Sequence, residues 1–336
     1  MKRITVLGAG TWGTALARML SNTGSVVTVW SALDSEVSTL SETRAHPNLP
    51  GVELPRELIF TDSMEEACRE MDLLLFAVPS PYVRETTRRA APYIGPGQLI
   101  ADAAKGIEAG TLLTMTGVIA DELKKAGAGP ARLVALSGPT HAEEVARDMP
   151  TTIVSASPDP EAARQVQDLC MNTCMRVYTN PDIRGVELCG AVKNVIALAS
   201  GISLGLGYGD NTKAAIITRG LAELTRLGCA MGCDRQTFTG LGGIGDLIVT
   251  ATSIHSRNNR CGQLIGGGLT PEEAVERTGM VVEGLHALPA VLELSRRYQV
   301  EMPIVEAVEA IIHGGVSPES AVRELMSRDR KDESGC

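Results

Sequence analysis

The stretch that decides the fold is ITVLGAGTWG, residues 4–13. A β-rich run leads into the pattern Gly8-x-Gly10-x-x-Gly13, and a helical run, residues 14–20, follows directly. In such a unit the first glycine permits a tight turn, the second lets the backbone approach a pyrophosphate, and the third lets the helix pack closely on the strand. The amide end of the helix attracts the anion. We therefore predict a dinucleotide-binding turn at residues 8–13.

The rest of the first half repeats this alternation of short β-rich runs and helical segments. The chain has 336 residues, of which 44% are hydrophobic, so it can bury the cores of two domains. The alternation predicts βαβ units and a mostly parallel sheet covered by helices. The β-rich runs are residues 4–8, 26–30, 73–78, 98–103, 132–137 and 151–156.

Strand signals stop near Asn180, and long helical patterns take over. Pro181 and Asp182 offer a turn and a helix start at the change. We predict the α/β class, with an N-terminal Rossmann-like doubly wound sheet that binds NAD(P) over residues 1–181. An all-α domain with the substrate and catalytic groups is expected over 182–328, and a polar tail over 329–336.

Charge and hydropathy argue against several classes of partner. The 40 acidic residues outnumber the 31 basic ones, for a net charge of −9, and no dense Lys/Arg cluster occurs, so nucleic acid is not expected. The first residues enter a strand without the apolar region of a signal peptide. No run of about 18 apolar residues is evident, so we expect no membrane span and a cytoplasmic protein.

Eight cysteines and five histidines are scattered along the chain. The closest cysteine pairs, Cys170/Cys174 and Cys229/Cys233, have helical spacing rather than the CxxC spacing of zinc and redox sites. We expect reduced, structural thiols. No HxxxH or HExxH pattern occurs, so no metal is expected.

The end of the second β-rich run bears on the choice between NAD and NADP. An acid there binds the ribose diol, and a basic residue binds the 2′-phosphate. The run ends Trp30-Ser31-Ala32-Leu33-Asp34, with neither an acid at the tip nor an arginine nearby, although Asp34 could reach back. The sequence therefore leaves NAD(H) and NADP(H) open.

Lys193 lies in AVKNVIALASG, residues 191–201, among residues typical of a buried helix. An ammonium there loses its water and needs a partner or a depressed pKa. Lys193 is therefore either paired with a carboxylate or placed for proton transfer.

Other polar residues stand in apolar or glycine-rich surroundings: Lys105, Ser137–Thr140, Asp246 and Ser256–Asn258. Each alone could be a loop charge, a helix cap, a salt-bridge partner or a solvated loop. Together they fit an anionic, hydroxylated substrate beside a nicotinamide, and the run SRNNR (256–260) supplies donors suited to a phosphate. The glycines at 240, 242, 243 and 245 would let Asp246 come close to a ligand.

These motifs, in this order, resemble the bacterial NAD(P)-dependent glycerol-3-phosphate dehydrogenases. The resemblance spans both halves of the chain. It is carried by the phrases GAGTWGTALA, VPS (78–80), KGIE (105–108), SGPTHAEEVA, RVYTNPD, GVELCGAVKNVIALASG, ITRGLAEL, GLGGIGDLIVT, SRN and VVEG (281–284).

The resemblance implies roles for individual residues, with Lys193 as the proton acceptor and with Lys105 and Asp246 beside it in the catalytic set. Beyond the three glycines, the cofactor would contact Thr11, Trp12, Lys105, Ala142, Arg257, Val281 and Glu283. Glycerol 3-phosphate would be surrounded by Lys105, Gly138, Thr140, Lys193, Asp246, Ser256, Arg257 and Asn258.

Two residues depart from the family pattern. Ala32 stands where family members often carry Arg or His, which weakens the case for a strong NADP preference. His141 replaces a frequent Phe.

The implied activity interconverts dihydroxyacetone phosphate and sn-glycerol 3-phosphate and supplies the latter for phospholipid synthesis. The expected partner is this small substrate, with a homodimer left open. Two alternatives stand: another β-hydroxyacid dehydrogenase of similar architecture, and a non-catalytic NAD(P)-sensing protein.

Overall fold

The computed structural model describes residues 1–330 and 332, and it divides the chain into two compact units. The first comprises Met1–Lys105 and Leu113–Ile183. The second comprises Gly106–Leu112 and the described residues from Arg184 onward. The segment 106–112 joins the helical unit, where Ile107 is buried in its core, and no sequence signal indicated this. Cys336 and most of the expected polar tail lie outside the described residues.

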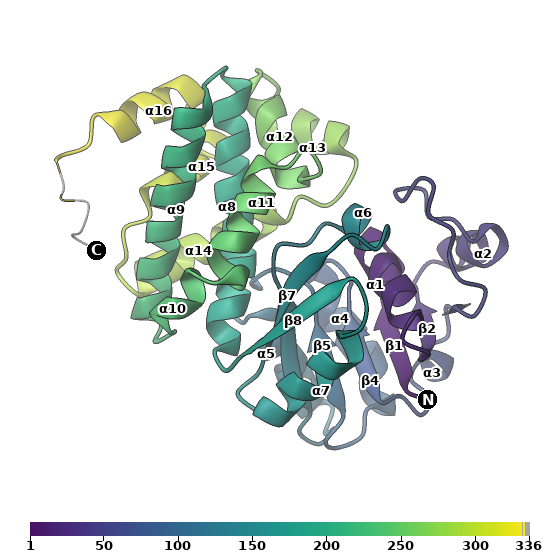
Figure 1. The fold of residues 1–336 in the computed structure, drawn as a ribbon. Coiled ribbons are helices and arrows are strands. Elements are labelled where there is room, and N and C mark those ends of the chain that lie inside the picture. Colours follow the sequence, from purple (N-terminus) through teal and green to yellow (C-terminus); the bar gives the residue numbers. More distant parts are fainter. Residues whose placement is uncertain (331, 333–336) are drawn as a thin grey trace. The chain divides into compact units, whose positions relative to one another are not determined.

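The first unit is built on an eight-stranded sheet in the order β3-β2-β1-β4-β5-β6-β7-β8 (Figure 1). All neighbours pair in parallel except β6 and β7, which are antiparallel. The strands are β1 Arg3–Leu7, β2 Val26–Trp30, β3 Ile59–Thr61, β4 Leu73–Phe76, β5 Leu99–Asp102, β6 Arg132–Ser137, β7 Thr151–Ala156 and β8 Met175–Asn180. The predicted Rossmann-like α/β class is confirmed, and β3 and β8 are strands that the sequence analysis missed.

Helices cover both faces of this sheet because the strand residues alternate between two hydrophobic cores. Ile4 and Val6 of β1 face the core formed with α1 and α7, whereas Leu7 belongs to the core formed with α3, α4 and α5. The helices of this unit are α1 Thr11–Ser21, α2 Asp34–Thr43, α3 Met64–Ala67, α4 Val83–Ala90, α5 Met115–Lys125, α6 Ala142–Val145 and α7 Pro160–Cys170, with short 3₁₀ turns η1 Ser80–Tyr82 and η2 Ala91–Tyr93.

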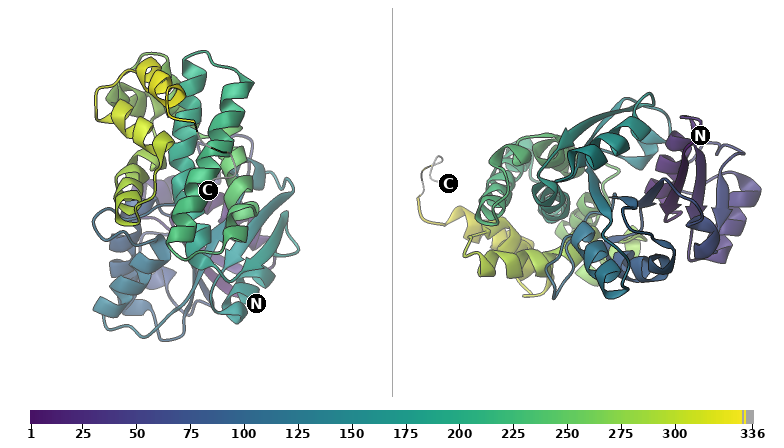
Figure 2. Two further views of the ribbon diagram at one scale, coloured as in Figure 1. Left: turned by 90° about the vertical axis from the view of Figure 1, so that its left-hand side faces the viewer. Right: turned by 90° about the horizontal axis from the view of Figure 1, so that it is seen from below.

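The second unit is helical, as predicted, and its longest helix, α8, is buried along most of its length. The Asn180 side chain accepts the Asp182 amide at 2.8 Å just before α8 begins. Helices α15 and α16 pack together (Figure 2). The elements are α8 Ile183–Gly205, α9 Asp210–Ala230, α10 Arg235–Phe238, a π-helical turn η3 Leu241–Gly245, α11 Asp246–Thr252, α12 Arg257–Gly266, α13 Pro271–Thr278, α14 Glu283–Arg297, α15 Pro303–Ile312 and α16 Pro318–Met326.

Helix α8 bears on the expectation that no segment spans a membrane. Its length and composition would suffice to cross a membrane, with a mean hydropathy of 1.5 over an 18-residue window. However, 83% of that window is buried inside the protein, which is the pattern of a core helix. The apolar run was overlooked because Glu187 and Lys193 interrupt it.

Candidate functional site

The glycine loop joins β1 to α1, and two of its glycines are required by close backbone contacts. Gly8 has φ of +119°, and a Cβ there would lie 2.9 Å from the Ala77 carbonyl group. A Cβ on Gly13 would lie 1.9 Å from the Gly8 oxygen. At Gly10, by contrast, nothing lies within 4 Å of the position that a Cβ would take. The loop therefore packs tightly at its ends and offers open space at its middle glycine.

The first turn of α1 suits an anion. Its N-cap residue is Gly10, which provides no side-chain cap, and the turn contains no acidic residue. The Thr14 hydroxyl donates to the Ala9 carbonyl at 2.8 Å and so fixes the loop against the helix. Amide groups and open space together fit the pyrophosphate of a dinucleotide.

A segment after α2 folds back on this loop, which the sequence did not indicate. The buried His46 ring donates to the Ala9 carbonyl, and its Nδ1 accepts the Asn48 amide at 3.1 Å. The Asn48 side chain donates to the Thr11 hydroxyl at 3.2 Å. Burial lowers the pKa of His46, while Glu36 and the Ala9 carbonyl oppose this, so the ring is mainly neutral near pH 7. The loop is thus held by neutral hydrogen bonds on its outer side.

A second group of predicted residues meets in the first unit around the carbonyl of Gly138. Lys105 Nζ donates to this oxygen at 3.2 Å, and the Thr140 hydroxyl donates to it at 3.3 Å. The N-cap of α6 is His141, and its side chain makes no cap, so Thr140 is not the helix cap that was one interpretation. Ala142 opens α6 and packs against the same hydrophobic core as Trp12.

In the second unit Lys193 and Asp246 form a buried ion pair. Lys193 is 4% exposed and Asp246 is fully buried. The ammonium donates to Asp246 Oδ1 and, at 2.7 Å, to the Thr250 hydroxyl, which in turn donates to the Asp246 main-chain oxygen at 2.7 Å. Thr250 was missed, although its spacing of four residues from Asp246 places both on one face of α11. The carboxylate and the hydroxyl fix the position of Nζ and stabilise its charge.

Asp246 is placed by the π-helical turn η3 that precedes α11. A Cβ on Gly243 would lie 2.1 Å from the Phe238 carbonyl oxygen, so this glycine is required for packing. A Cβ on Gly242 would meet only the Val186 side chain, at 3.5 Å or more. The expectation that these glycines clear space for a ligand is therefore corrected for Gly243, whose contact is internal.

The run Ser256–Asn258 begins α12, and its three side chains do different things. The Ser256 hydroxyl caps the helix by accepting the Asn259 amide at 3.2 Å. Arg257 is half-buried and makes no hydrogen bond or ion pair to another residue in the described chain. The Asn258 amide donates to Asn194 Oδ1 at 2.9 Å and accepts the Gly284 amide at 2.8 Å. Asn258 therefore ties α12 to α8 and α14.

The remaining predicted residues lie at the start of α14. Glu283 is its first residue and Val281 precedes the N-cap Val282. The bond from Gly284 to Asn258 places them beside the beginning of α12.

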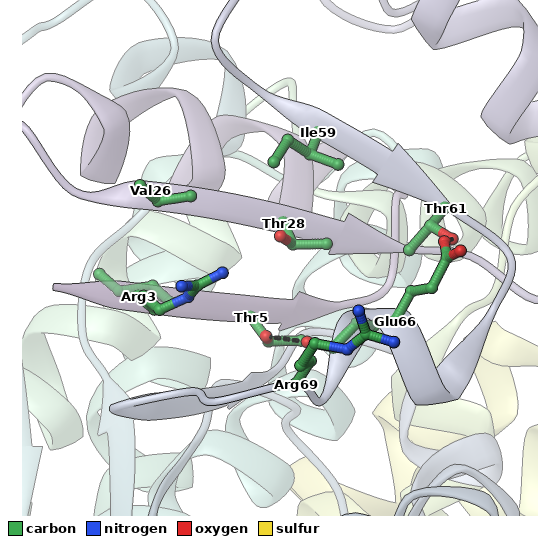
Figure 3. A pocket seen from close by; sticks show the side chains of 10 residues that line it. Arg3, Thr5, Val26, Thr28, Ile59, Thr61, Glu66 and Arg69 are labelled. Atoms are coloured by element: carbon green, nitrogen blue, oxygen red, sulfur yellow. Dashed lines mark hydrogen bonds between the residues drawn. The ribbon is translucent and has the colours of Figure 1, made fainter.

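A recess of about 220 Å³ in the first unit (Figure 3) contains none of the glycine-loop residues in its lining. Arg3 and Val26, which line it, are the first residues of β1 and β2, whereas the loop follows the other end of β1. Two of its polar side chains are already engaged, since Arg3 pairs with Glu70 at 3.3 Å and the Thr5 hydroxyl donates to the Ala67 carbonyl. This recess is not part of the candidate site.

Metal ligands and cysteines contribute nothing to the site within the described residues. No group of three or more His, Cys, Asp or Glu side chains there could hold a metal ion. The seven described cysteines are free thiols, and burial raises the pKa of Cys170 to about 12.

Comparison with known proteins gives a consistent result over both units. The family model described as NAD-dependent glycerol-3-phosphate dehydrogenase N-terminus matches residues 3–163, and the corresponding C-terminus model matches residues 182–323. A relative from Lactobacillus delbrueckii subsp. bulgaricus, named glycerol-3-phosphate dehydrogenase (NAD(P)+) 2, is 60% identical over 334 residues, which is 99% of both chains. A Bacillus subtilis glycerol-3-phosphate dehydrogenase (NAD(P)+) is 47% identical, covering 99% of this chain and 96% of its own. The crystal structure of glycerol-3-phosphate dehydrogenase from Coxiella burnetii has a TM-score of 0.92 at 37% identity, covering 97% of this chain and 99% of its own.

Proposed function

The chain belongs to the NAD-dependent glycerol-3-phosphate dehydrogenase family, and we propose that it interconverts dihydroxyacetone phosphate and sn-glycerol 3-phosphate with NAD(H) or NADP(H). The observation that carries the proposal is the buried Lys193 held by Asp246 and Thr250 in a chain that matches this family over both units. The alternatives, another β-hydroxyacid dehydrogenase or a non-catalytic sensor, are not favoured. The family matches cover both units, and a buried lysine suited to proton transfer is present.

The dinucleotide is assigned to the first unit. Gly8, Gly10 and Gly13 with the amides of Thr11 and Trp12 would hold its pyrophosphate, and the open space at Gly10 supports this. By resemblance, Lys105, Ala142, Arg257, Val281 and Glu283 are also assigned to the cofactor. A nicotinamide held by these residues would supply the hydride for reduction and accept it in oxidation.

Lys193 is assigned the proton. During reduction negative charge develops on the ketone oxygen at C2, and the Lys193 ammonium stabilises that charge and then donates a proton to it. During oxidation the neutral amine takes the proton back. Asp246 and Thr250 keep Nζ in place through both directions, so they act as orienting groups.

The phosphate and the hydroxyl groups are assigned to the remaining residues. Arg257, together with the start of α12 at Ser256, would bind the phosphate, because a guanidinium can hold it with two parallel bonds. By resemblance, Lys105, Gly138 and Thr140 are also assigned to the substrate. Asn258 is assigned to the substrate by resemblance. Its hydrogen bonds to Asn194 and Gly284 would hold its side chain in a fixed orientation for that contact.

The proposal includes a cytoplasmic location and a supply of glycerol 3-phosphate to phospholipid synthesis, as the sequence led us to expect. Self-association into a homodimer stays a prediction, which sedimentation of the full chain would test.

The decisive experiment measures loss of NADH and NADPH absorbance on adding dihydroxyacetone phosphate. Dihydroxyacetone, the same ketone without phosphate, is the matched control. We expect kcat/KM to be at least about 100-fold higher for the phosphorylated ketone, since charge-assisted bonds to phosphate contribute about 1.5–3 kcal/mol each. Equal rates with both ketones, or turnover of hydroxy acids instead, would contradict the proposal.

A further inference from the structure

The end of β2 carries an acidic group that the sequence pattern did not indicate. Asp34 is exposed, and the residue that reaches back is Glu36, from the first turn of α2. The buried Ser31 hydroxyl donates to Glu36 Oε2 at 2.5 Å and accepts the Leu33 amide at 3.2 Å. The carboxylate is therefore fixed to the strand end by a serine where a Rossmann-type strand often ends in an acid.

This carboxylate lies beside the glycine loop. The Gly8 amide donates to the Trp30 carbonyl at 2.9 Å, so the loop and the end of β2 are adjacent. His46 donates to the Ala9 carbonyl of the loop, and the charge of Glu36 acts to raise the pKa of this histidine. Glu36 Oε1 makes no hydrogen bond to another residue within 1–330.

Nearby cations are engaged elsewhere. Residues 31–43 contain no lysine or arginine, while α2 carries three acids, Asp34, Glu36 and Glu42. The Arg44 guanidinium donates to the Leu58 carbonyl at 2.7 Å and lies over Phe60. Arg89 stacks on the Trp30 ring at 4.8 Å. Burial lowers the pKa of His46, which disfavours its charged form, and its Nδ1 already accepts an amide.

We propose that Glu36, oriented by Ser31, is the residue that makes this enzyme select NAD(H) over NADP(H). A ribose diol offers hydroxyl donors to a carboxylate, whereas a 2′-phosphate brings about two negative charges toward it and repels it. The inference rests on the proposed function, because it assumes that the first unit binds a dinucleotide.

The test measures the Kd of NADH and of NADPH by isothermal titration calorimetry of the full chain, without ketone substrate. Wild type should bind NADH at least about 10-fold more tightly than NADPH. Glu36→Gln should reduce this ratio by about 10-fold, mainly through tighter NADPH binding. Glu42→Gln makes the same change farther along the same helix and should leave the ratio unaltered.

A second measurement uses the unmodified protein, in case Glu36→Gln does not fold. Raising the salt concentration from about 0.05 M to about 0.5 M should lower the ratio of the NADPH Kd to the NADH Kd, because screening weakens repulsion between partly exposed charges. The probe pair adenosine 5′-monophosphate and adenosine 2′,5′-bisphosphate should show the same preference. Ser31→Ala retains the Glu36 charge, so it should weaken NADH binding while NADPH remains the poorer ligand.

Different failures are distinguishable. Equal Kd values for the two dinucleotides in wild type, or a ratio that Glu36→Gln does not change, would overturn the inference while leaving the dehydrogenase intact. The same shift from Glu42→Gln would also overturn it, because general charge on α2 would then be responsible. Absence of binding by either dinucleotide would contradict the proposed function itself.

Discussion

Replacing Lys193 with methionine separates the catalytic role that we propose for this residue from its structural role in the ion pair. Methionine keeps an unbranched stem of similar length and removes the charge. In the native protein the ammonium is buried with Asp246 and hydrogen-bonded to Thr250. Lys193→Met therefore leaves a buried carboxylate that has lost its cation.

Two magnitudes follow from this arrangement. Breaking a buried ion pair by removing one partner costs about 3–5 kcal/mol of stability. Loss of a positioned acid/base group lowers kcat by at least about 10²-fold, which is about 2.7 kcal/mol of barrier. The first magnitude can unfold a protein of ordinary stability, so the single variant alone does not decide the matter.

The double variant Lys193→Met/Asp246→Asn removes both charges and should recover much of the lost stability. We expect it to melt closer to wild type than the single variant, to bind NADH with unchanged Kd, and to remain at least about 10²-fold slower in kcat. Lys125→Met, which breaks the exposed pair with Asp121, is the control and should change neither quantity. A folded single or double variant with near-wild-type kcat would refute the assignment of Lys193 as the proton-transfer group.

Three further changes test other parts of the site and fold. The Gly10→Ala variant should keep the wild-type melting temperature, because its added methyl group contacts no other residue. It should bind NADH at least about 10-fold more weakly in calorimetry, because the methyl group fills the space proposed for the pyrophosphate. Gly13→Ala should lower the melting temperature strongly, because its methyl group would overlap the Gly8 oxygen. Arg257→Ala should raise KM for dihydroxyacetone phosphate at least about 10-fold in steady-state kinetics, with partial rescue by Arg257→Lys and no effect from the exposed Arg260→Ala. Burial raises the pKa of Glu223, which accepts the amides at the start of α15, from 4.5 to about 7. Between these two pH values, folding is therefore accompanied by uptake of a proton, and the free energy of unfolding of the wild type falls as the pH rises. Glutamine at position 223 does not titrate. Between pH 5 and 8, urea unfolding should therefore show the free energy of unfolding of Glu223→Gln rising by up to roughly 3 kcal/mol relative to that of the wild type.

Each of these has an outcome that would contradict it. Normal NADH binding by Gly10→Ala would mean that the pyrophosphate lies elsewhere. An unchanged KM in Arg257→Ala would mean that the start of α12 is a solvated polar segment and does not bind the phosphate. Parallel pH–stability curves for wild type and Glu223→Gln would show that the carboxylate is not held in its neutral form.

Much of the fold could be predicted because it is encoded locally. The glycine pattern and the alternation of β-rich and helical runs predicted six strands, and all six occur. The missed strands have weaker signals. Strand β3 has three residues, and β8 at the sheet edge buries only alternate positions, so neither contains a continuous apolar run.

The sequence indicated which types of residue could form the candidate site, but it did not indicate which of these residues contact one another. A lysine in an apolar helix indicated a partner, but Asp246 lies 53 positions away in sequence, and only the tertiary fold brings the two together. Glu36 was overlooked because the sequence pattern for NAD binding places an acid at the end of the second strand. In this chain Ser31 occupies that place and holds an acid from the following helix. His46 reaches the glycine loop from a segment with no motif at all.

The residues of the second unit that we propose for substrate binding owe their relative positions to glycine contacts between α8 and α12. A Cβ on Gly201 would lie 2.1 Å from the Asn259 oxygen, and one on Gly262 would lie 2.2 Å from the Leu198 oxygen. The two backbones are therefore in direct contact, and a larger side chain at either position would push the helices apart. Lys193 lies on α8 and Arg257 begins α12. The helix contact, together with the Asn194–Asn258 hydrogen bond, therefore sets the distance from the proposed proton-transfer group to the proposed phosphate site. A rigid helix pair is suited to that task, because a ketone and a phosphate on one small molecule must be held at a fixed separation while the proton moves.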